Sequence, residues 1–207
     1  MNVKIRLAER QDVAAMLQIY APFIKNTSIS FEEEVPTEEA FWERVQAVLR
    51  KAPWLVCTFD GVVIAYAYAG SHRGRASYRW NRELSAYVHP DYRRRNIAGA
   101  LYQVLFEGVV WQGYTNALAG IVLPNEASVK FHERVGFQLI GIYRRIGYKF
   151  GQYWDVGWWE KPLSPRELPP GNIKPLEELL ASIHWKDIVQ AAEDTIEITK
   201  DLKSDVI

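Results

Sequence analysis

The stretch that decides the fold reads LSAYVHPDYRRRNIA, residues 84–98 of a 207-residue chain. Its pattern predicts a long strand over 78–88, a connection over 89–95 and a helix from about 97 to 112. The first N–H groups of a helix have no acceptor within the helix, so a helix N-terminus attracts anions. Three consecutive arginines at this point add charged donors. The stretch therefore predicts an anion site, although a solvated basic loop that caps a helix would look the same.

The segments on both sides predict a mixed sheet. Asp12 is placed to cap a first helix that runs to about residue 23, and Asp60-Gly61 is a hairpin signal between two strands. The expected strands are 3–7, 54–59, 62–69, 117–123, 137–146 and 153–159, and the other expected helices are 36–49 and 126–135. This order predicts an α/β (α+β) fold with a strongly twisted sheet of about six to seven strands, flanked by helices on both faces.

The composition changes after Pro162, where a proline-rich stretch predicts a linker. We expect a domain over 1–163 and a linker with a helical C-terminal extension over 164–207. Two amphipathic helical pieces are predicted in the extension, at 174–183 and 185–202. The extension is too small for a core of its own, so it must pack on the domain or on a second subunit.

Composition narrows the possible partners and the compartment. Arg plus Lys and Asp plus Glu both number 25, so no net charge favours nucleic acid or a membrane surface. The single cysteine, Cys57, and the lack of an N-terminal signal pattern favour a cytoplasmic protein. His72 and His89 lie in no histidine and carboxylate cluster with ligand spacing, so we expect no metal.

A second block, NEASVKFHERVGF at residues 125–137, predicts a capped helix that ends at a glycine. With the first block it resembles the cofactor motifs of the GNAT acetyltransferase superfamily. Arg93, Asn96 and Ala98 take the fixed positions of that family's Q/R-x-x-G-x-G/A loop. Asn96 replaces a glycine, and asparagine tolerates a positive φ better than most residues with a Cβ.

The resemblance implies the GNAT fold and acetyl-CoA as co-substrate. It also implies a set of cofactor-contacting residues along the strand end, the loop and the second block. These are Ala86, Tyr87, Val88, Arg93, Arg94, Arg95, Asn96, Ile97, Ala98, Gly99, Asn125, Ser128 and His132.

Three further segments, 26–34, 78–90 and 147–155, are similar to the phosphinothricin-type acetyltransferases within this superfamily. That family acetylates the α-amine of phosphinothricin, methionine sulfone or methionine sulfoximine, and its members usually form dimers. The likeness implies a small amino-acid acceptor and a homodimer. Ile183 and Trp185 in the C-terminal extension could extend the contact between the two subunits. Trp80, Asn81 and Arg82 depart from the family's R-x-T-V-E run, so the resemblance does not determine which amino acid is the acceptor.

The chemistry requires a base, because an amine is protonated at neutral pH and must lose a proton before it attacks a thioester. The resemblance implies Glu83 as this base; the alternative is an ordinary glutamate paired with Arg79 or Arg82. A backbone amide near Val88 is expected to stabilise the oxyanion. His132 either assists the leaving thiolate or is a packed, hydrogen-bonded histidine.

The acceptor's acidic groups call for cations and hydroxyls, and arginine suits them well. The residues expected to bind the acceptor are Phe31, Arg73, Arg75, Tyr78 and Glu83. Two other functions stay open: a GNAT enzyme for a different amine (a polyamine, an aminoglycoside or a protein N-terminus), and a sensor that binds acyl-CoA without catalysis.

Overall fold

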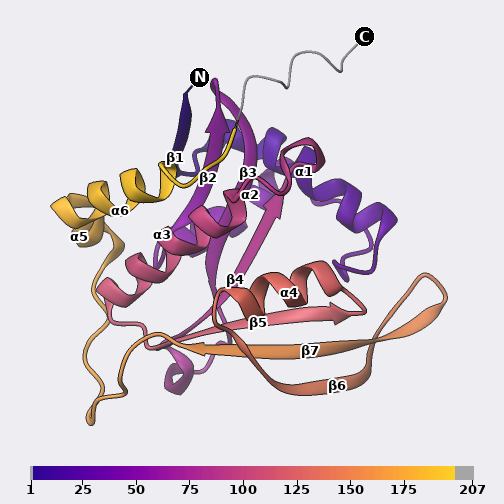
Figure 1. The fold of residues 1–207 in the computed structure, drawn as a ribbon. Coiled ribbons are helices and arrows are strands. Elements are labelled where there is room, and N and C mark those ends of the chain that lie inside the picture. The colour runs from indigo at the N-terminus through magenta and orange to yellow at the C-terminus, as the bar shows by residue number, and fades with distance from the viewer. Residues whose placement is uncertain (1, 199–207) are drawn as a thin grey trace.

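The computed structural model describes residues 2–198 of the chain (Figure 1). These residues form seven strands and six α-helices. The strands are β1 Val3–Leu7, β2 Trp54–Phe59, β3 Val62–Ser71, β4 Asn81–Val88, β5 Asn116–Leu123, β6 Gln138–Lys149 and β7 Gln152–Pro162. The helices are α1 Val13–Asn26, α2 Glu38–Leu49, α3 Ile97–Gln112, α4 Glu126–Arg134, α5 Leu176–Ala181 and α6 Ile183–Glu193.

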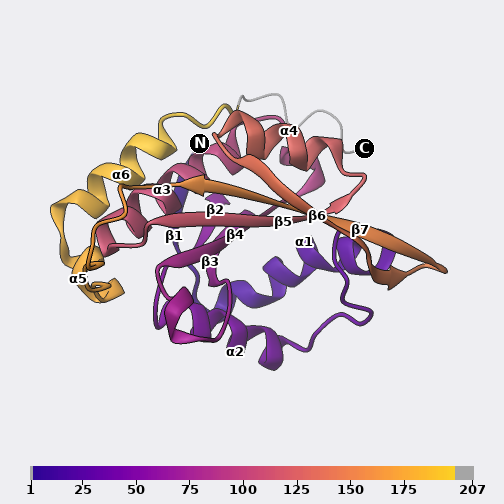
Figure 2. The ribbon, with the colours of Figure 1, turned by 90° about the horizontal axis from the view of Figure 1, so that it is seen from below.

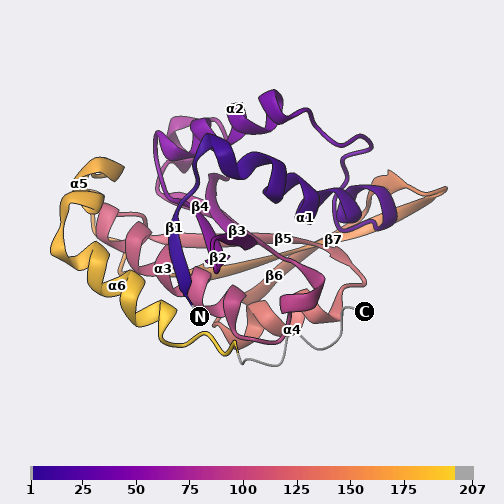
Figure 3. The ribbon, with the colours of Figure 1, turned by 90° about the horizontal axis from the view of Figure 1, so that it is seen from above.

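The strands form one sheet in the order β1-β2-β3-β4-β5-β7-β6. Every neighbouring pair is antiparallel except β4 and β5, which are parallel. Helices cover both faces: α1 and α2 lie on one side, and α3, α4 and α6 lie on the other (Figures 2 and 3). The predicted mixed, twisted sheet with helices on both faces is confirmed.

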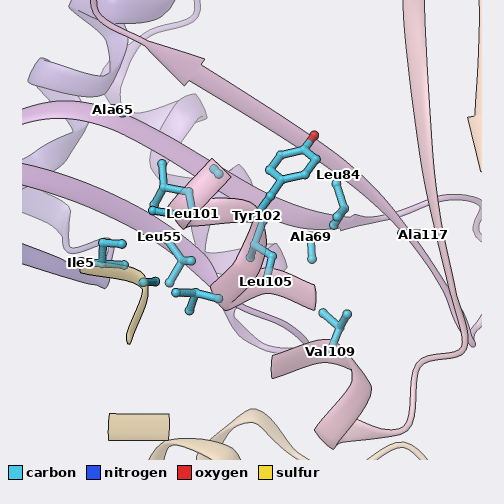
Figure 4. Close-up of a cluster of buried hydrophobic side chains, with 14 of the residues drawn as sticks. Ile5, Leu55, Ala65, Ala69, Leu84, Leu101, Tyr102, Leu105, Val109 and Ala117 are labelled. Carbon is cyan, nitrogen blue, oxygen red and sulfur yellow. The ribbon is translucent and has the colours of Figure 1, made fainter. Parts of the chain in front are cut away.

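The alternation of side chains along each strand gives every face of the sheet its own core. On β3, Ala65, Ala67 and Ala69 face α3, whereas Tyr66 and Tyr68 face α1 and α2. The small alanines leave room for Leu101 and other large side chains of α3 to pack closely on the sheet (Figure 4). Each face of the sheet thus has its own packed core, and β4, which carries Glu83, lies next to β3 between these two cores.

The differences from the predicted elements include two boundaries and one helix cap. The strand expected from residue 78 begins at Asn81, because residues 76–78 form a 3-10 turn and the Asn81 side chain donates to the Tyr78 carbonyl. Helix α1 continues through Pro22 to Asn26 rather than ending near residue 23. Asp12 does not cap it: the carboxylate accepts bonds from the Glu9 N–H and the Arg6 guanidinium.

The C-terminal helices pack on the same chain. Helix α6 lies against α3 and β1, and the Glu193 carboxylate accepts a 2.7 Å bond from the Ile5 N–H at the sheet edge. The second helical piece ends at Glu193, not at residue 202; residues 199–202 lie outside the described part of the chain. Within residues 2–198, no helix is long and apolar enough to cross a membrane.

Candidate active site

The centre of the sheet contains an opening between β4 and β5. The two strands pair only from Asn81–Asn116 to Glu83–Leu118, after which β4 continues beside β3 and β5 continues beside β7. Figure 1 shows the two strands diverging like a V. The backbone groups of Ser85–Val88 on this side therefore have no strand partner and can bind an extended ligand. Ala86, Tyr87 and Val88, predicted to contact the cofactor, lie here.

The basic loop predicted to hold a phosphate joins β4 to the start of α3. Asn96 takes a left-handed conformation with φ of 57°, as its identity predicts, and so does Arg94 with φ of 61°. The Asn96 side chain donates to the Thr195 carbonyl at 3.2 Å, and its oxygen lies over the Cα of Gly99, where a Cβ would clash. The C-terminal segment and a glycine three residues on thus hold this turn, which neither sequence block reveals.

The second block forms α4, next to β5. Asn125 caps the helix by accepting a 3.2 Å bond from the Ser128 N–H. The structure confirms the capped helix. Because the same amide also carries a donor nitrogen, Asn125 can cap the helix and still donate to a ligand in the opening.

Glu83 lies on β4 at the point where β4 and β5 separate. Its carboxylate is 3.3 Å from Nδ1 of His72, and Nε of Arg73 donates to Nε2 of the same imidazole at 3.3 Å. An imidazole that accepts at Nε2 carries its proton at Nδ1 when neutral, so His72 donates to Glu83. Glu83 is not paired with Arg79 or Arg82, which was the expected alternative. Arg79 stacks on the Trp80 ring, and Arg82 donates to the hydroxyls of Ser71 and Tyr114.

Burial raises the pKa of Glu83 above its ordinary value, and the hydrogen bond from His72 together with the charge of Arg73 opposes that rise. About a third of the carboxylate side chain stays exposed. A carboxylate that is partly desolvated but still reachable is a stronger base than one in water.

His132 is packed and hydrogen-bonded on both sides of its ring. Nδ1 donates to the Ser128 carbonyl at 2.8 Å, so Nε2 accepts from the Tyr102 hydroxyl at 3.0 Å. Burial lowers the pKa of His132 and keeps the ring neutral. This geometry favours the packed histidine over a direct proton donor to the thiolate.

The residues predicted to bind the acceptor fall into two places. Arg73, Arg75 and Tyr78 line one cavity of about 460 Å³, with His72 between this cavity and Glu83. Phe31 lies elsewhere: its ring covers Gly147 on β6, where a Cβ would clash with it.

Lys149 on β6 holds the loop that carries Phe31. This side chain is 5% exposed, and its ammonium donates to four backbone carbonyls of residues 24–32 at 2.6–3.1 Å. His72 and Lys149 are further functional candidates: from the sequence, His72 is considered only as a metal ligand and Lys149 has no role of its own. A lysine in a strand gives no signal of this kind, but the adjacent His72 and Arg73 in one loop could have suggested a link to Glu83.

Within residues 2–198, no group of three or more His, Cys, Asp or Glu side chains is placed to hold a metal ion.

A parallel strand pair that opens beside a helix N-terminus, with a partly buried carboxylate at the fork, suits an enzyme that binds an extended anionic cofactor. Residues 5–158 match the family described as acetyltransferase (GNAT) domain, which is more than half of the chain. The chain therefore belongs to the GNAT acetyltransferases, which transfer an acetyl group from acetyl-CoA to an amine.

Several relatives narrow the likeness further. The chain is 33% identical to the phosphinothricin N-acetyltransferase of Streptomyces viridochromogenes over 86% of its own length and 96% of the relative. It is 29% identical to the L-methionine sulfoximine/L-methionine sulfone acetyltransferase of Salmonella typhimurium, over 80% and 97% of the two chains. The crystal structure of a GNAT superfamily phosphinothricin acetyltransferase from Sinorhizobium meliloti in complex with AcCoA has a TM-score of 0.74 at 29% identity, covering 79% of this chain and 90% of that one.

Proposed function

We propose that this enzyme acetylates the α-amine of a small amino acid with a tetrahedral polar head, of the phosphinothricin, methionine sulfone or methionine sulfoximine type. The observation that carries the proposal is the hydrogen-bonded series Arg73–His72–Glu83, in which a carboxylate and a cation lie close together at the fork of β4 and β5. The names of the relatives support the same acceptor class. An arginine beside the base suits an acceptor that carries its own carboxylate.

The reaction in this site is direct attack of the amine on the thioester. Glu83 takes the proton of the amine, directly or through a water molecule, and the nitrogen forms a bond to the carbonyl carbon. A free backbone N–H near Val88 stabilises the oxyanion that forms. The C–S bond then breaks and coenzyme A leaves as a thiolate, which is a good leaving group because thiols are far more acidic than alcohols. The nitrogen loses its second proton to the thiolate or to water, which leaves a neutral amide and the thiol of coenzyme A. Arg93 to Gly99 and Asn125 bind the cofactor in this scheme.

The test is release of free thiol from acetyl-CoA with a panel of amines. Methionine sulfone, methionine sulfoximine and phosphinothricin should give kcat/KM values well above those for spermidine or an aminoglycoside. A preference for the polyamine or aminoglycoside would reject the acceptor class. Saturable acetyl-CoA binding with no release for any amine would favour the sensor.

Arg73→Ala should raise KM for the amino acid about tenfold or more, because a hydrogen bond to a charged group is worth about 1.5–3 kcal/mol. KM for acetyl-CoA should change little. Arg75→Ala should give a smaller rise, because Arg75 makes no bond to the His72–Glu83 pair in the described part of the chain. Arg10→Ala, which removes a surface arginine paired with Glu38 and Glu39, is the control. Equal rises in both KM values for Arg73→Ala would remove Arg73 from the acceptor site.

His72→Gln should move the acidic limb of the kcat/KM profile to higher pH. The imidazole opposes the pKa rise of Glu83, so its loss lets burial act with less opposition. Proton transfer then weakens as the pH falls through this higher value. The profile is measured between pH 5 and 9 with the preferred amino acid. A profile that superimposes on that of the wild type would show that His72 does not position Glu83.

We further propose that the enzyme works as a cytoplasmic homodimer, with a catalytic domain over 1–163 and an extension over 164–207. The long β6–β7 hairpin supports the dimer, because it projects beyond the end of β5 and exposes Leu139, Tyr143 and Ile146 (Figure 1). Ile183 is also exposed, whereas Trp185 packs beside Gly108 of its own chain. Light scattering should give twice the mass of one chain, and the mass of a single chain would reject the dimer.

The compartment is tested by cell fractionation. The enzyme should be recovered in the cytosol, and recovery in another fraction would reject the cytoplasmic location.

A further inference from the structure

A short part of the C-terminal extension, residues 193–197, contacts the loop at the start of α3; we call it the docking segment. Helix α6 runs antiparallel to α3, because Trp185 near the start of α6 packs beside Gly108, whereas Thr195 just after α6 lies beside Asn96. The match to the acetyltransferase family ends at residue 158. The contact with the loop therefore comes from a segment outside the matched domain.

Two hydrogen bonds join the docking segment to successive residues of the loop. The side-chain amide of Asn96 donates to the Thr195 carbonyl at 3.2 Å, and the Glu197 N–H donates to the Arg95 carbonyl at 3.1 Å. The first bond holds a side chain of the loop, and the second holds its backbone. Since the Asn96 oxygen lies over Gly99, both ends of this amide are occupied by the protein itself.

The docking segment is itself attached to the domain at several points. The Glu193 carboxylate accepts a 2.7 Å bond from the Ile5 N–H and pairs with the Lys4 ammonium at 3.1 Å, which ties the end of α6 to β1. The Ile196 side chain packs on the core that α3 shares with the sheet. A segment held in this way can support the loop that it contacts.

The backbone of the loop needs such support. Arg94 and Asn96 both have positive φ angles, 61° and 57°, which are unfavourable for residues with a Cβ. Conformations of this kind persist where the surrounding structure determines them. A loop that is already held in one conformation loses less conformational entropy when a ligand binds to it. Support from the docking segment should therefore raise the affinity of the loop for phosphate groups.

We propose that Thr195 and Glu197 are positioning residues for the cofactor loop, so that the affinity for acetyl-CoA depends on the C-terminal extension. The inference rests on the proposed binding of the cofactor by residues 93–99. Coupling between two binding events is reciprocal. If the docked segment raises the affinity for coenzyme A, bound coenzyme A must stabilise the docked segment by the same factor.

Hydrogen exchange of the full chain, with and without saturating coenzyme A, tests this coupling in the absence of turnover. Coenzyme A should slow exchange in peptides that cover residues 94–101 and also in those that cover 194–198. No slowing in either stretch would reject the proposed place of the cofactor, and the inference with it. Slowing in 94–101 alone would leave the place of the cofactor intact and overturn the coupling.

Two variants measure the size of the effect by calorimetry of coenzyme A. Asn96→Gly removes the bond to the Thr195 carbonyl but still allows positive φ, and Glu197→Pro removes the N–H that donates to Arg95. Each should raise the Kd about three- to tenfold, the effect of losing one neutral hydrogen bond. At saturating acetyl-CoA, kcat and KM for the amino acid should stay within about twofold of the wild type.

Gln190→Ala is the matched control, because it removes a side-chain bond to Asp194 on the exposed side of α6 and leaves both contacts with the loop in place. Its Kd for coenzyme A should equal that of the wild type. Kd values of Asn96→Gly and Glu197→Pro equal to or below that of this control would overturn the proposal. Equal rises in KM for acetyl-CoA and for the amino acid would also overturn it, because they would indicate a general structural defect.

Discussion

Replacing Glu83 by glutamine should lower kcat about 10²- to 10⁴-fold at neutral pH, the usual contribution of a positioned general base. Glutamine keeps the size of the side chain and can still accept the hydrogen bond from His72, so the fork between β4 and β5 should persist. Affinity for acetyl-CoA should therefore stay near that of the wild type. Steady-state kinetics with the preferred amino acid, together with calorimetry of acetyl-CoA, measure the two effects.

The pH dependence of kcat/KM gives a second test of the role of Glu83. Burial raises the pKa of Glu83, so the base begins to be lost at a higher pH than an exposed glutamate would be. The wild-type kcat/KM should fall as the pH decreases through this raised value, and Glu83→Gln should lack that limb. Glu178→Gln, at an exposed position of α5, is the matched control. Turnover of Glu83→Gln within twofold of the wild type would remove Glu83 from the mechanism.

Lys149→Met should lower the free energy of unfolding by about 2–4 kcal/mol, since each buried acceptor left without a donor costs about 1–3 kcal/mol and water can reach some of them. The carbonyls of Ile24, Thr27, Ser30 and Glu32 all lose the same ammonium. Methionine fills the volume of the lysine stem, so the loss reports the hydrogen bonds rather than a cavity. Urea unfolding followed by tryptophan fluorescence measures it.

The same change should also raise KM for the amino acid, because the released segment carries Phe31 over Gly147. Lys130→Met removes an exposed lysine that pairs with Glu126, and it should cost no more than about 0.5 kcal/mol. If Lys149→Met were no less stable than Lys130→Met, Lys149 would not be what holds residues 24–32 in place.

Most of the fold could be predicted from local patterns. The Asp60-Gly61 hairpin, the end of α2 at Leu49 and helix α3 from Ile97 to Gln112 all lie where the sequence predicts them. The failures lie where side chains satisfy backbone groups that periodicity does not detect, as at the 3-10 turn before β4. The ends of α1 and α6 could not be predicted from local patterns either, because tertiary packing decides where a helix stops.

The candidate site also combines features that depend on the local sequence with features that depend on contacts between distant segments. Helix α4 and the start of α3 are local structures, because a helix start and a capped helix depend on neighbours within a few positions, so the sequence alone determined them. The positive φ of Asn96 is also favoured locally, but its side chain is held by the distant Thr195 carbonyl. The partner of Glu83 came from a loop eleven residues earlier, and Lys149 reaches carbonyls more than a hundred residues away.

Arg82 makes the distinction sharpest. Its sequence neighbours suggested a pairing with Glu83, but a strand sends successive side chains to opposite faces. Only the packing of β4 against Tyr114 and the C-terminal extension decided that this arginine is buried, with no carboxylate of residues 2–198 in an ion pair with it. Local chemistry determined what kind of enzyme this chain is, whereas contacts between distant segments decided which charges meet.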